Sequence, residues 1–327
     1  MVYLDNHTET SPCALALEQF RLAFEQGVDL QAAQDKIFDL TGADEDASLA
    51  FVSSGAEAIA TVHWSVFLDI CRKEGKCHFV TASSEDAPML QSLKRLEELG
   101  CFVKLVPFDS EGKLDLQELR KLLGPRTALL SISWAQALSG VIHPIEEIAA
   151  LAQEKGVLLH VDATYSLGKI SCAFSQLPID YLSFAGDRIH SVPSSGAVIA
   201  KKNRPLVPFV PGRSIDKAAL AALGAAAAQA NLSLDLMSLE TARLRDEFEE
   251  GLTNTVPNVQ FLYRDSVRLP NVSAAIFPHI HNEMLLFALQ RRGLKASIGG
   301  SLSPHIHRLL GHFDEKLNEI SNTNSRK

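Results

Sequence analysis

The turn Ser53-Ser54-Gly55 is the first part of the sequence whose residue types could do chemistry. It follows an apolar run and precedes Ala56-Glu57-Ala58, a stretch that is typical of a helix start. Backbone N–H groups at a helix N-terminus bind anions such as phosphate without help from side chains. Serines at this place also serve as structural helix caps. The turn is therefore either an anion site or a cap.

Two histidine pairs, His279 with His281 and His305 with His307, share a Pro-His-Ile-His pattern. Imidazoles two residues apart lie on one face of a strand, where they could ligate one metal ion. The second pair falls where a helix should begin, and such neighbours do not face each other on a helix. We therefore expect no metal site.

Cysteine usage and charge limit the class of protein. The five cysteines are scattered and form no Cys-x-x-Cys pair, which is typical of buried thiols in a reducing, cytoplasmic setting. The net charge of -8, without a Lys/Arg-rich stripe, argues against nucleic-acid binding. No apolar run is long enough for a membrane span, and Val2-Tyr3-Leu4-Asp5 is unlike a signal peptide. A protein or a small anion is the expected partner.

From residue 48 to about 200, short apolar runs alternate with amphipathic stretches, as in a mostly parallel sheet covered by helices. The expected fold class is therefore α/β. The expected strands are Leu49 to Val52, Cys77 to Thr81, Phe102 to Val106, Ala128 to Ile132, Val157 to Asp162 and Tyr181 to Phe184. The expected helices are Met89 to Leu99, Leu116 to Leu123 and Ile145 to Lys155.

The C-terminal part is expected to form a smaller unit. Alanine-rich Lys217 to Ala230 predicts a helix, and a second helix is expected from about Leu236 to Leu252. The segments after it are expected to be strand, helix, strand and helix: Val272 to Phe277, Glu283 to Arg292, Leu294 to Ser297 and Pro304 to Leu310. The expected division is an N-terminal segment of the small domain (1–16), a large α/β domain (17–230) and a small α+β domain (231–327).

The order of these segments resembles the cysteine desulfurases of the NifS and IscS group, which are class V aminotransferases of the fold type I pyridoxal phosphate (PLP) enzymes. The resemblance spans nearly the whole chain, and it implies their large and small domains and a homodimer. It rests on Tyr3-Leu4-Asp5-Asn6, Phe108 to Leu116, Gly140 to Ile145, His160-Val161-Asp162-Ala163, Ser166-Leu167-Gly168-Lys169, Asp180 to Phe184, Arg268-Leu269-Pro270-Asn271 and Gly311.

The resemblance also implies that the cofactor chemistry is lost. The family's Schiff-base lysine aligns with Arg188, whose guanidinium stays protonated and cannot form an imine. A serine and a histidine that bind the phosphate align with Ala185 and Asp187. At about 4 Å and an effective dielectric near 20, the repulsion between the Asp187 carboxylate and each negative charge of the phosphate costs roughly 4 kcal/mol. Covalent PLP binding is not expected.

The remaining family-equivalent positions are mostly changed as well. Asp162 is kept, either as the partner of the pyridine nitrogen or as a structural residue that closes a strand. Ser53, Ser54 and Gly55 align with the phosphate cradle. The substituted positions are Ala56 for a threonine, Asp86 for the ring-stacking histidine, Gln136 or Ala137 for an asparagine, Tyr165 for a glutamine and Asp216 for a threonine that reaches the partner subunit's phosphate.

The loop that carries the family's persulfide-forming cysteine is missing, because Ser297 to Pro304 leads directly to the next expected helix. Lys169 follows the Asp162 strand, but the family has a lysine there beside its catalytic one, so a surface or turn role is expected.

Three hypotheses follow. In the first, the chain is a catalytically inactive pseudoenzyme, retained as a binding or regulatory subunit. In the second, it is a PLP-dependent or phosphoanion-binding enzyme with altered chemistry that uses Asp162, Tyr165 and Arg188. In the third, it pairs with a true cysteine desulfurase.

Overall fold

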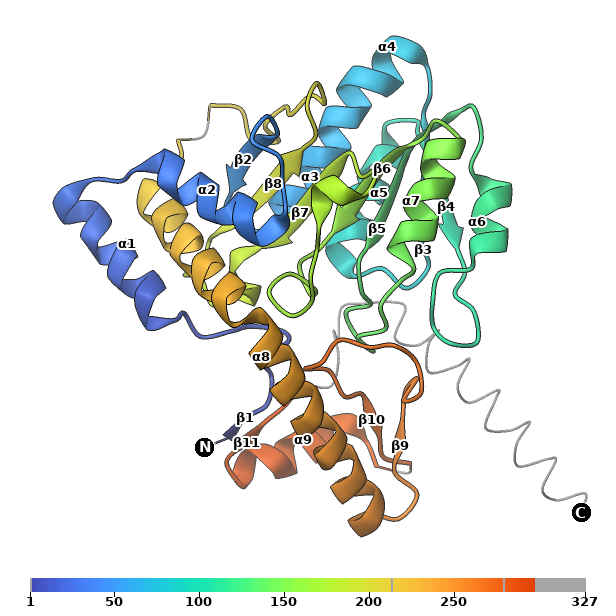
Figure 1. Cartoon of the computed structure of the whole chain (residues 1–327). Helices are drawn as coiled ribbons and strands as arrows, with labels where there is room; N and C mark the ends of the chain where they lie inside the picture. Colours follow the sequence, from blue (N-terminus) through green and yellow to red (C-terminus); the bar gives the residue numbers. More distant parts are fainter. Residues whose placement is uncertain (1, 213, 279, 298–327) are drawn as a thin grey trace, which may run out of the picture.

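A computed structural model describes residues 2–212, 214–278 and 280–297 (Figure 1). A seven-stranded sheet forms the centre of the larger unit. Its strands are β2 (Ser48–Val52), β3 (His78–Ala82), β4 (Phe102–Val106), β5 (Thr127–Ser133), β6 (Leu158–Asp162), β7 (Tyr181–Ala185) and β8 (Gly196–Ala200). The α/β prediction is confirmed, and β8 is the strand of this sheet that the sequence analysis missed.

The strands lie in the order β2-β8-β7-β6-β5-β3-β4. Only β8 is antiparallel to its neighbours, so the other six strands end at the same edge of the sheet. Every residue of β5 is buried, because helices cover both faces of the sheet. Such strands carry continuous apolar runs, which is why the sequence pattern located them well.

Two helical layers enclose the sheet. One core cluster packs α2 (Leu30–Thr41), α6 (Leu116–Leu122), α7 (Ile145–Glu154) and the start of α8 against one face. The other packs α3 (Gly55–Val66) and α5 (Ala87–Glu98) against the opposite face. Helix α1 (Ala14–Gln26) packs against α8. Short elements complete this unit: the π-helix η1 (Phe67–Cys71), α4 (Arg72–Glu74), η2 (Phe174–Gln176) and η3 (Gly186–Arg188).

Helix α8 (Lys217–Thr255) is continuous over 39 residues, so the prediction of two separate helices is wrong. Residues 231–235 contain neither proline nor glycine, and nothing interrupts the backbone hydrogen bonds. The helix is long and apolar enough to cross a membrane by length and composition. Its alanine-rich start is buried, however, and packs on α1 and α2, which explains the apolar composition.

The smaller unit contains two short sheets and a helix. Strand β1 (Val2–Tyr3) pairs in parallel with β11 (Leu294–Lys295), and β9 (Gln260–Phe261) pairs antiparallel with β10 (Ala275–Ile276). Helix α9 (Asn282–Arg291) lies before β11. The strand predicted over 272–277 is thus only two residues long, and the helix predicted over 304–310 lies outside the described residues. The N-terminus belongs to this unit through β1.

Candidate functional site

A cavity of about 300 Å³ opens at the edge of the sheet where the parallel strands end. Ligands bind at this edge in open α/β sheets. The structure brings ten of the twelve family-equivalent positions to its wall: Ser53, Ser54, Gly55, Ala56, Asp86, Asp162, Tyr165, Ala185, Asp187 and Arg188. Residues far apart in the sequence therefore form one site.

The start of α3 forms one wall of this cavity. The Ser54 side chain caps the helix by accepting a hydrogen bond of 3.1 Å from the Glu57 amide. The Glu57 carboxylate reaches back to the Ser53 amide at 2.8 Å and also accepts from the Ser53 hydroxyl. The arrangement resembles a capping box, except that the Glu57 carboxylate bonds the amide of Ser53, one residue before the N-cap. The amide of Ser53 is thus already bonded to an anion of the chain itself.

The turn after β7 forms the opposite wall. The Arg188 guanidinium donates to the neighbouring Asp187 carboxylate at 2.6 Å and lies 5.9 Å from the centre of the Tyr165 ring. Its Nε is buried without a hydrogen-bond partner among the described residues. Thr10 holds the turn from the N-terminal segment, because its amide and hydroxyl both donate to the Asp187 carbonyl.

Asp86 and Tyr165 face each other across the cavity. Asp86 caps α5 through a 2.8 Å hydrogen bond from the Ala87 amide, and it accepts another of 2.8 Å from the Tyr165 hydroxyl. Burial and the nearby Asp86 carboxylate raise the pKa of Tyr165. The Tyr165 ring also packs on His7, with ring centres 4.7 Å apart. The aligned aspartate therefore occupies a hydrogen-bonded structural position.

Asp162 lies at the floor, at the end of β6, with 5% of its surface exposed. It accepts hydrogen bonds from the hydroxyls of Ser183 (2.6 Å) and Thr164 (2.9 Å). Burial outweighs these bonds and raises the pKa of Asp162 to about 6. The hydrogen bonds of the Asp162 carboxylate are thus supplied by neighbouring side chains, which supports a structural role for this residue.

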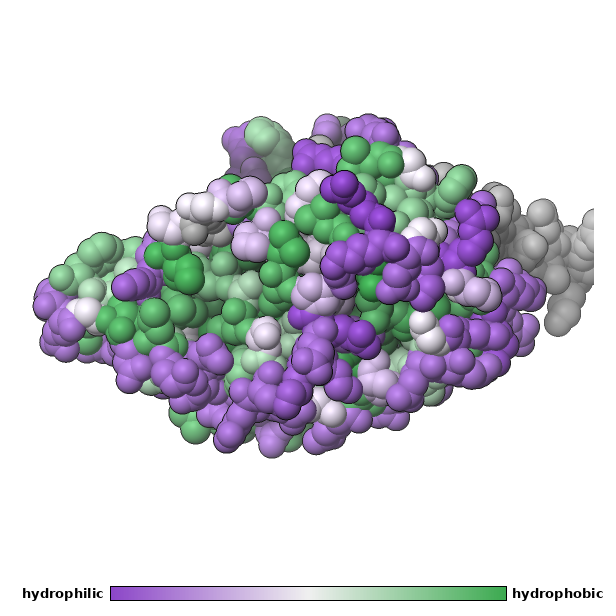
Figure 2. All heavy atoms as spheres, turned by 90° about the horizontal axis from the view of Figure 1, so that it is seen from above, coloured by the Kyte–Doolittle hydropathy of each residue, from purple (hydrophilic) through white to green (hydrophobic). Residues whose placement is uncertain are grey.

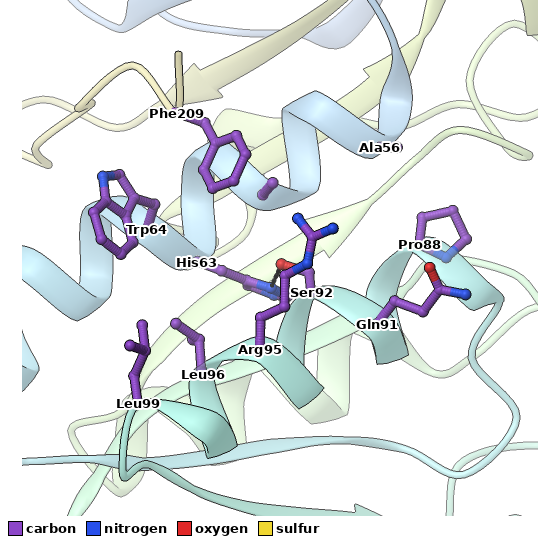
Figure 3. Close-up of a pocket in the computed structure, with 11 residues that line it drawn as sticks. Ala56, His63, Trp64, Pro88, Gln91, Ser92, Arg95, Leu96, Leu99 and Phe209 are labelled. Carbon is purple, nitrogen blue, oxygen red and sulfur yellow. Dashed lines mark hydrogen bonds between the residues drawn. The ribbon is translucent and has the colours of Figure 1, made fainter. Parts of the chain in front are cut away.

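A buried chain of hydrogen bonds runs from Asp162 to a second cavity. Its links are Ser183, His160, Ser131, His63 and Ser92, joined at distances of 2.6 to 2.9 Å. The second cavity, of about 420 Å³, lies between α3 and α5 and shares Ala56 and Pro88 with the first (Figure 3). Figure 3 shows the His63 side chain bonded to Ser92 beneath Arg95. Desolvation lowers the pKa of His63 to about 3, so this imidazole is neutral.

Glu85 is a site residue that the sequence analysis missed. Its carboxylate accepts from the Ser133 amide at 2.8 Å and contacts the Ser133 hydroxyl at 2.5 Å. Only 2% of its surface is exposed, and burial raises its pKa to about 8. The one signal in the sequence is the adjacent pair Glu85-Asp86, which does not reveal which carboxyl is buried.

Three expected positions lie elsewhere. Gln136 donates to the Gly112 carbonyl and accepts from Ser139, so it holds a loop together. Asp216 caps α8 by accepting from the amides of Ala218 and Ala219. Lys169 lies in a turn, as predicted, and its half-buried amine donates to the Arg188 carbonyl.

The two Pro-His-Ile-His segments and the loop from Ser297 to Pro304 lie only partly within the described residues. His281 precedes α9, while His279, His305 and His307 lie outside the described residues. The same holds for residues 298–304 of the shortened loop.

The residues that line the first cavity do not fit pyridoxal phosphate. The guanidinium of Arg188 cannot become the amine that an imine requires. The Glu57 carboxylate is bonded to the Ser53 amide at the start of α3, so a phosphate bound there would meet a nearby negative charge. Asp86 and Asp187 add negative charge to the described wall beside one arginine, which opposes a phosphate dianion, whereas Glu85, with a pKa of about 8, is mostly protonated at neutral pH.

Comparisons with known proteins agree with the fold. The model of the family "Aminotransferase class-V" matches residues 14–217. A cysteine desulfurase of Gluconacetobacter diazotrophicus is 31% identical, over 94% of this chain and 84% of that protein. A cysteine desulfurase of Cereibacter sphaeroides is also 31% identical, over 83% of this chain and 71% of that protein. A solved "NIFS-LIKE PROTEIN" superimposes with a TM-score of 0.85 at 25% identity, covering 90% of this chain and 87% of its own.

A NifS-like protein of Rickettsia africae gives a TM-score of 0.84 at 19% identity, over 95% of this chain and 90% of its own, which supports the fold alone. Because the family model covers most of the chain and relatives above 30% identity match over most of their length, the chain belongs to the class V aminotransferase family and is similar to the NifS-like cysteine desulfurases.

Proposed function

We propose that this chain is a desulfurase-like protein without cysteine desulfurase activity, retained as a binding or regulatory subunit. The observation that carries the proposal is Arg188, which stands where the reaction needs an amine and pairs with Asp187 at 2.6 Å. A guanidinium that is permanently protonated cannot form the imine on which this chemistry depends.

The other changes around the cavity support the same conclusion because they act together. A single replaced residue could be an alternative solution to the same chemistry. Here the amine is replaced, the Ser53 amide is bonded to Glu57, and further carboxylates line the wall. Each change by itself weakens the binding of a phosphorylated aldehyde, and together they weaken it further.

The direct test is reconstitution. The purified chain is incubated with PLP, its visible absorbance is recorded before and after borohydride reduction, and sulfide release from cysteine is measured. An active cysteine desulfurase treated in parallel is the control. We expect neither an aldimine band nor sulfide. A reduced adduct located on a lysine of this cavity by peptide mass spectrometry contradicts the proposal.

The proposed binding role requires a surface for a partner. Figure 2 shows apolar side chains gathered on the side of α1 and α2, beside a largely polar remainder. Phe24 on α1 is 75% exposed, and Leu232 and Leu236 on α8 are 85% and 74% exposed. Large exposed apolar side chains gathered on one face are typical of interaction sites, which makes the side of α1 and α2 the candidate surface.

We propose a homodimer in the cytoplasm as the first occupant of this surface. Light scattering coupled to size exclusion tests the dimer, and a monomer at micromolar concentration contradicts it. A true cysteine desulfurase is the second candidate partner, and mixing the two purified proteins before the same measurement distinguishes a mixed dimer from two separate homodimers.

A second candidate function is binding of a phosphoanion, with altered chemistry. It is favoured by Arg188 Nε, which is buried without a partner among the described residues. Calorimetric titration with inorganic phosphate tests it: saturable heat that disappears in Arg188→Gln favours this candidate, and the absence of heat favours the first.

A further inference from the structure

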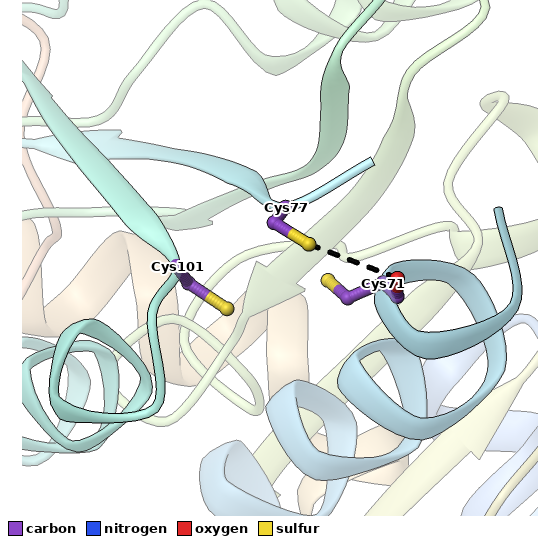
Figure 4. A group of neighbouring side chains, drawn as sticks. All are labelled: Cys71, Cys77 and Cys101. Atoms are coloured by element: carbon purple, nitrogen blue, oxygen red, sulfur yellow. Dashed lines mark hydrogen bonds between the residues drawn. The ribbon is translucent and has the colours of Figure 1, made fainter. Parts of the chain in front are cut away.

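Three of the five cysteines lie together at the end of the sheet opposite to the candidate site. The Sγ atoms of Cys71, Cys77 and Cys101 all lie within 4.8 Å of one another. Figure 4 shows their side chains converging from three separate segments of the chain. These cysteines are scattered in the sequence, but the fold brings the three together.

The sheet register brings two of these residues together. Cys77 directly precedes β3 and Cys101 directly precedes β4, and these neighbouring parallel strands pair His78 with Phe102. The Phe102 amide donates to the Cys77 carbonyl at 2.8 Å, which fixes the two cysteines side by side at the amino-terminal edge of the sheet.

A π-helical turn delivers the third cysteine. Helix α3 continues into η1, and Cys71 is the last residue of this wider turn. Single π-helical turns are rare and frequently occur at functional sites. The Cys77 thiol lies 3.7 Å from the Cys71 carbonyl, so the end of this helix rests directly on the strand pair.

We propose that Cys71, Cys77 and Cys101 form a binding site for one Zn²⁺ ion. Thiolates bind this ion well, and three protein ligands leave its fourth position for water or another small ligand. Binding exchanges three thiol protons, which are released to solvent, for the three Zn–S bonds.

The distances suit such an ion. Zn–S bonds of about 2.3 Å place neighbouring sulfur atoms roughly 4 Å apart. The present limit of 4.8 Å requires a contraction of less than about 1 Å, which side-chain rotation supplies. Cys71 and Cys101 are buried, while Cys77 is half-buried and leaves a route for the ion and for the fourth ligand.

Buried thiols in an apolar core are the alternative explanation, since Cys71 and Cys101 belong to the cluster that includes Phe79 and Leu96. Random burial does not require three thiols to converge. The matched case is Cys172, which is also buried but whose thiol contacts Ser166 and the Ile170 carbonyl instead. No other group of three potential metal ligands was found among the described residues.

The test is titration of the reduced protein with Zn²⁺, followed by mass spectrometry under non-denaturing conditions and by equilibrium dialysis. We expect one ion per chain and a rise in Tm with added Zn²⁺. Cys77→Ser, at the half-buried position, should weaken binding by at least about tenfold, because it removes a direct ligand. Cys172→Ser and Cys13→Ser are the matched controls and should bind as the parent does.

Substitution with Co²⁺ gives a second measurement on the unaltered chain, which guards against variants that fail to fold. Thiolate ligands produce an intense near-ultraviolet charge-transfer absorption with Co²⁺, and histidine ligands do not. Binding without this absorption, binding unchanged in Cys77→Ser, or no binding of Zn²⁺ by the folded, reduced chain overturns the proposal.

Discussion

The carboxylate of Glu57 is hydrogen-bonded to both the amide and the hydroxyl of Ser53, across the first turn of α3. This internal bond matters because the same helix start is where an anionic ligand would bind. Glu57 thus stabilises the helix and adds a negative charge at its start. The cavity therefore lies where a cofactor binds in this fold, but the charges and hydrogen-bond donors that line it differ.

Restoring the lysine alone should not restore cofactor binding. For Arg188→Lys we expect no stable aldimine band with PLP, because the Ser53 amide remains bonded to Glu57 and the acidic wall is unchanged. Absorbance before and after borohydride reduction is the measurement. A full aldimine band in this single variant would show that the lysine was the only missing part.

Combining Arg188→Lys with Glu57→Gln should bind PLP about tenfold or more tightly than the single variant, since one nearby negative charge is removed. Arg120→Lys, on an exposed helix face, controls for imines formed at any added lysine. If PLP forms an imine equally with the lysines at positions 188 and 120, the cavity does not contribute to PLP binding.

Glu85→Gln should stabilise the protein at alkaline pH. The folded-state pKa of Glu85, about 8, lies above the unfolded value of 4.5, so the folded state holds its proton more tightly. Stability from this group is present below pH 4.5 and falls as pH rises to about 8. The side-chain amide of the glutamine does not ionise, so this stability is not lost, and its oxygen still accepts a hydrogen bond from Ser133.

The gain from Glu85→Gln, on the order of a few kcal/mol, should be visible at pH 8 and vanish near pH 4.5. Urea unfolding at both pH values measures it. Glu98→Gln, an exposed change on α5, should show no such dependence. A gain independent of pH would point to packing rather than ionisation.

Removing Arg268 should strongly destabilise the smaller unit. Its guanidinium bonds both carboxylate oxygens of Glu249, at 2.9 and 3.2 Å, and their side chains are 2% and 1% exposed. Arg268→Met leaves the buried Glu249 with only the more exposed Arg264 at 3.3 Å, which costs up to about 3–5 kcal/mol. The double variant Arg268→Met with Glu249→Leu should recover most of the lost free energy of unfolding. Urea unfolding of the single and the double variant measures the difference. Equal instability of both variants would argue against an electrostatic cause.

Two glycines of α8 form a matched pair. A Cβ at Gly224 would lie 2.8 Å from the Ala33 Cα on α2, whereas one at Gly251 meets nothing within 4 Å. Gly224→Ala should therefore destabilise by about 1–3 kcal/mol through overpacking, less the gain in helix propensity. Gly251→Ala should stabilise by up to about 1 kcal/mol. Thermal unfolding measures both, and a stabilising Gly224→Ala would show that α2 can shift.

The sequence predicted most of the sheet because its central strands are buried on both faces and stand out as apolar runs between turns. The edge strand Phe102–Val106 is also matched without error, although three of its five residues are exposed. Strand β8 was missed because three of the five residues of Gly196–Ala200 are glycine or alanine, which weakens the β-branched signal. The division of α8 into two helices failed because local composition does not reveal whether a helix continues.

The candidate site was predictable where residues follow strands that end at one edge, as Asp162 and Arg188 do. Gln136 and Asp216 were aligned to the same function but hold a loop and a helix end, and the sequence alone gave no sign of this. Glu85 was missed because burial, which raises its pKa, depends on residues that are distant in sequence.

The sequence by itself determined the α/β fold and the absence of an imine-forming lysine at position 188, because periodicity and side-chain chemistry are local properties. Only the tertiary structure decided that Glu85 is buried and that Cys71, Cys77 and Cys101 meet. These facts depend on strand register and helix packing, which join segments that the chain itself keeps apart.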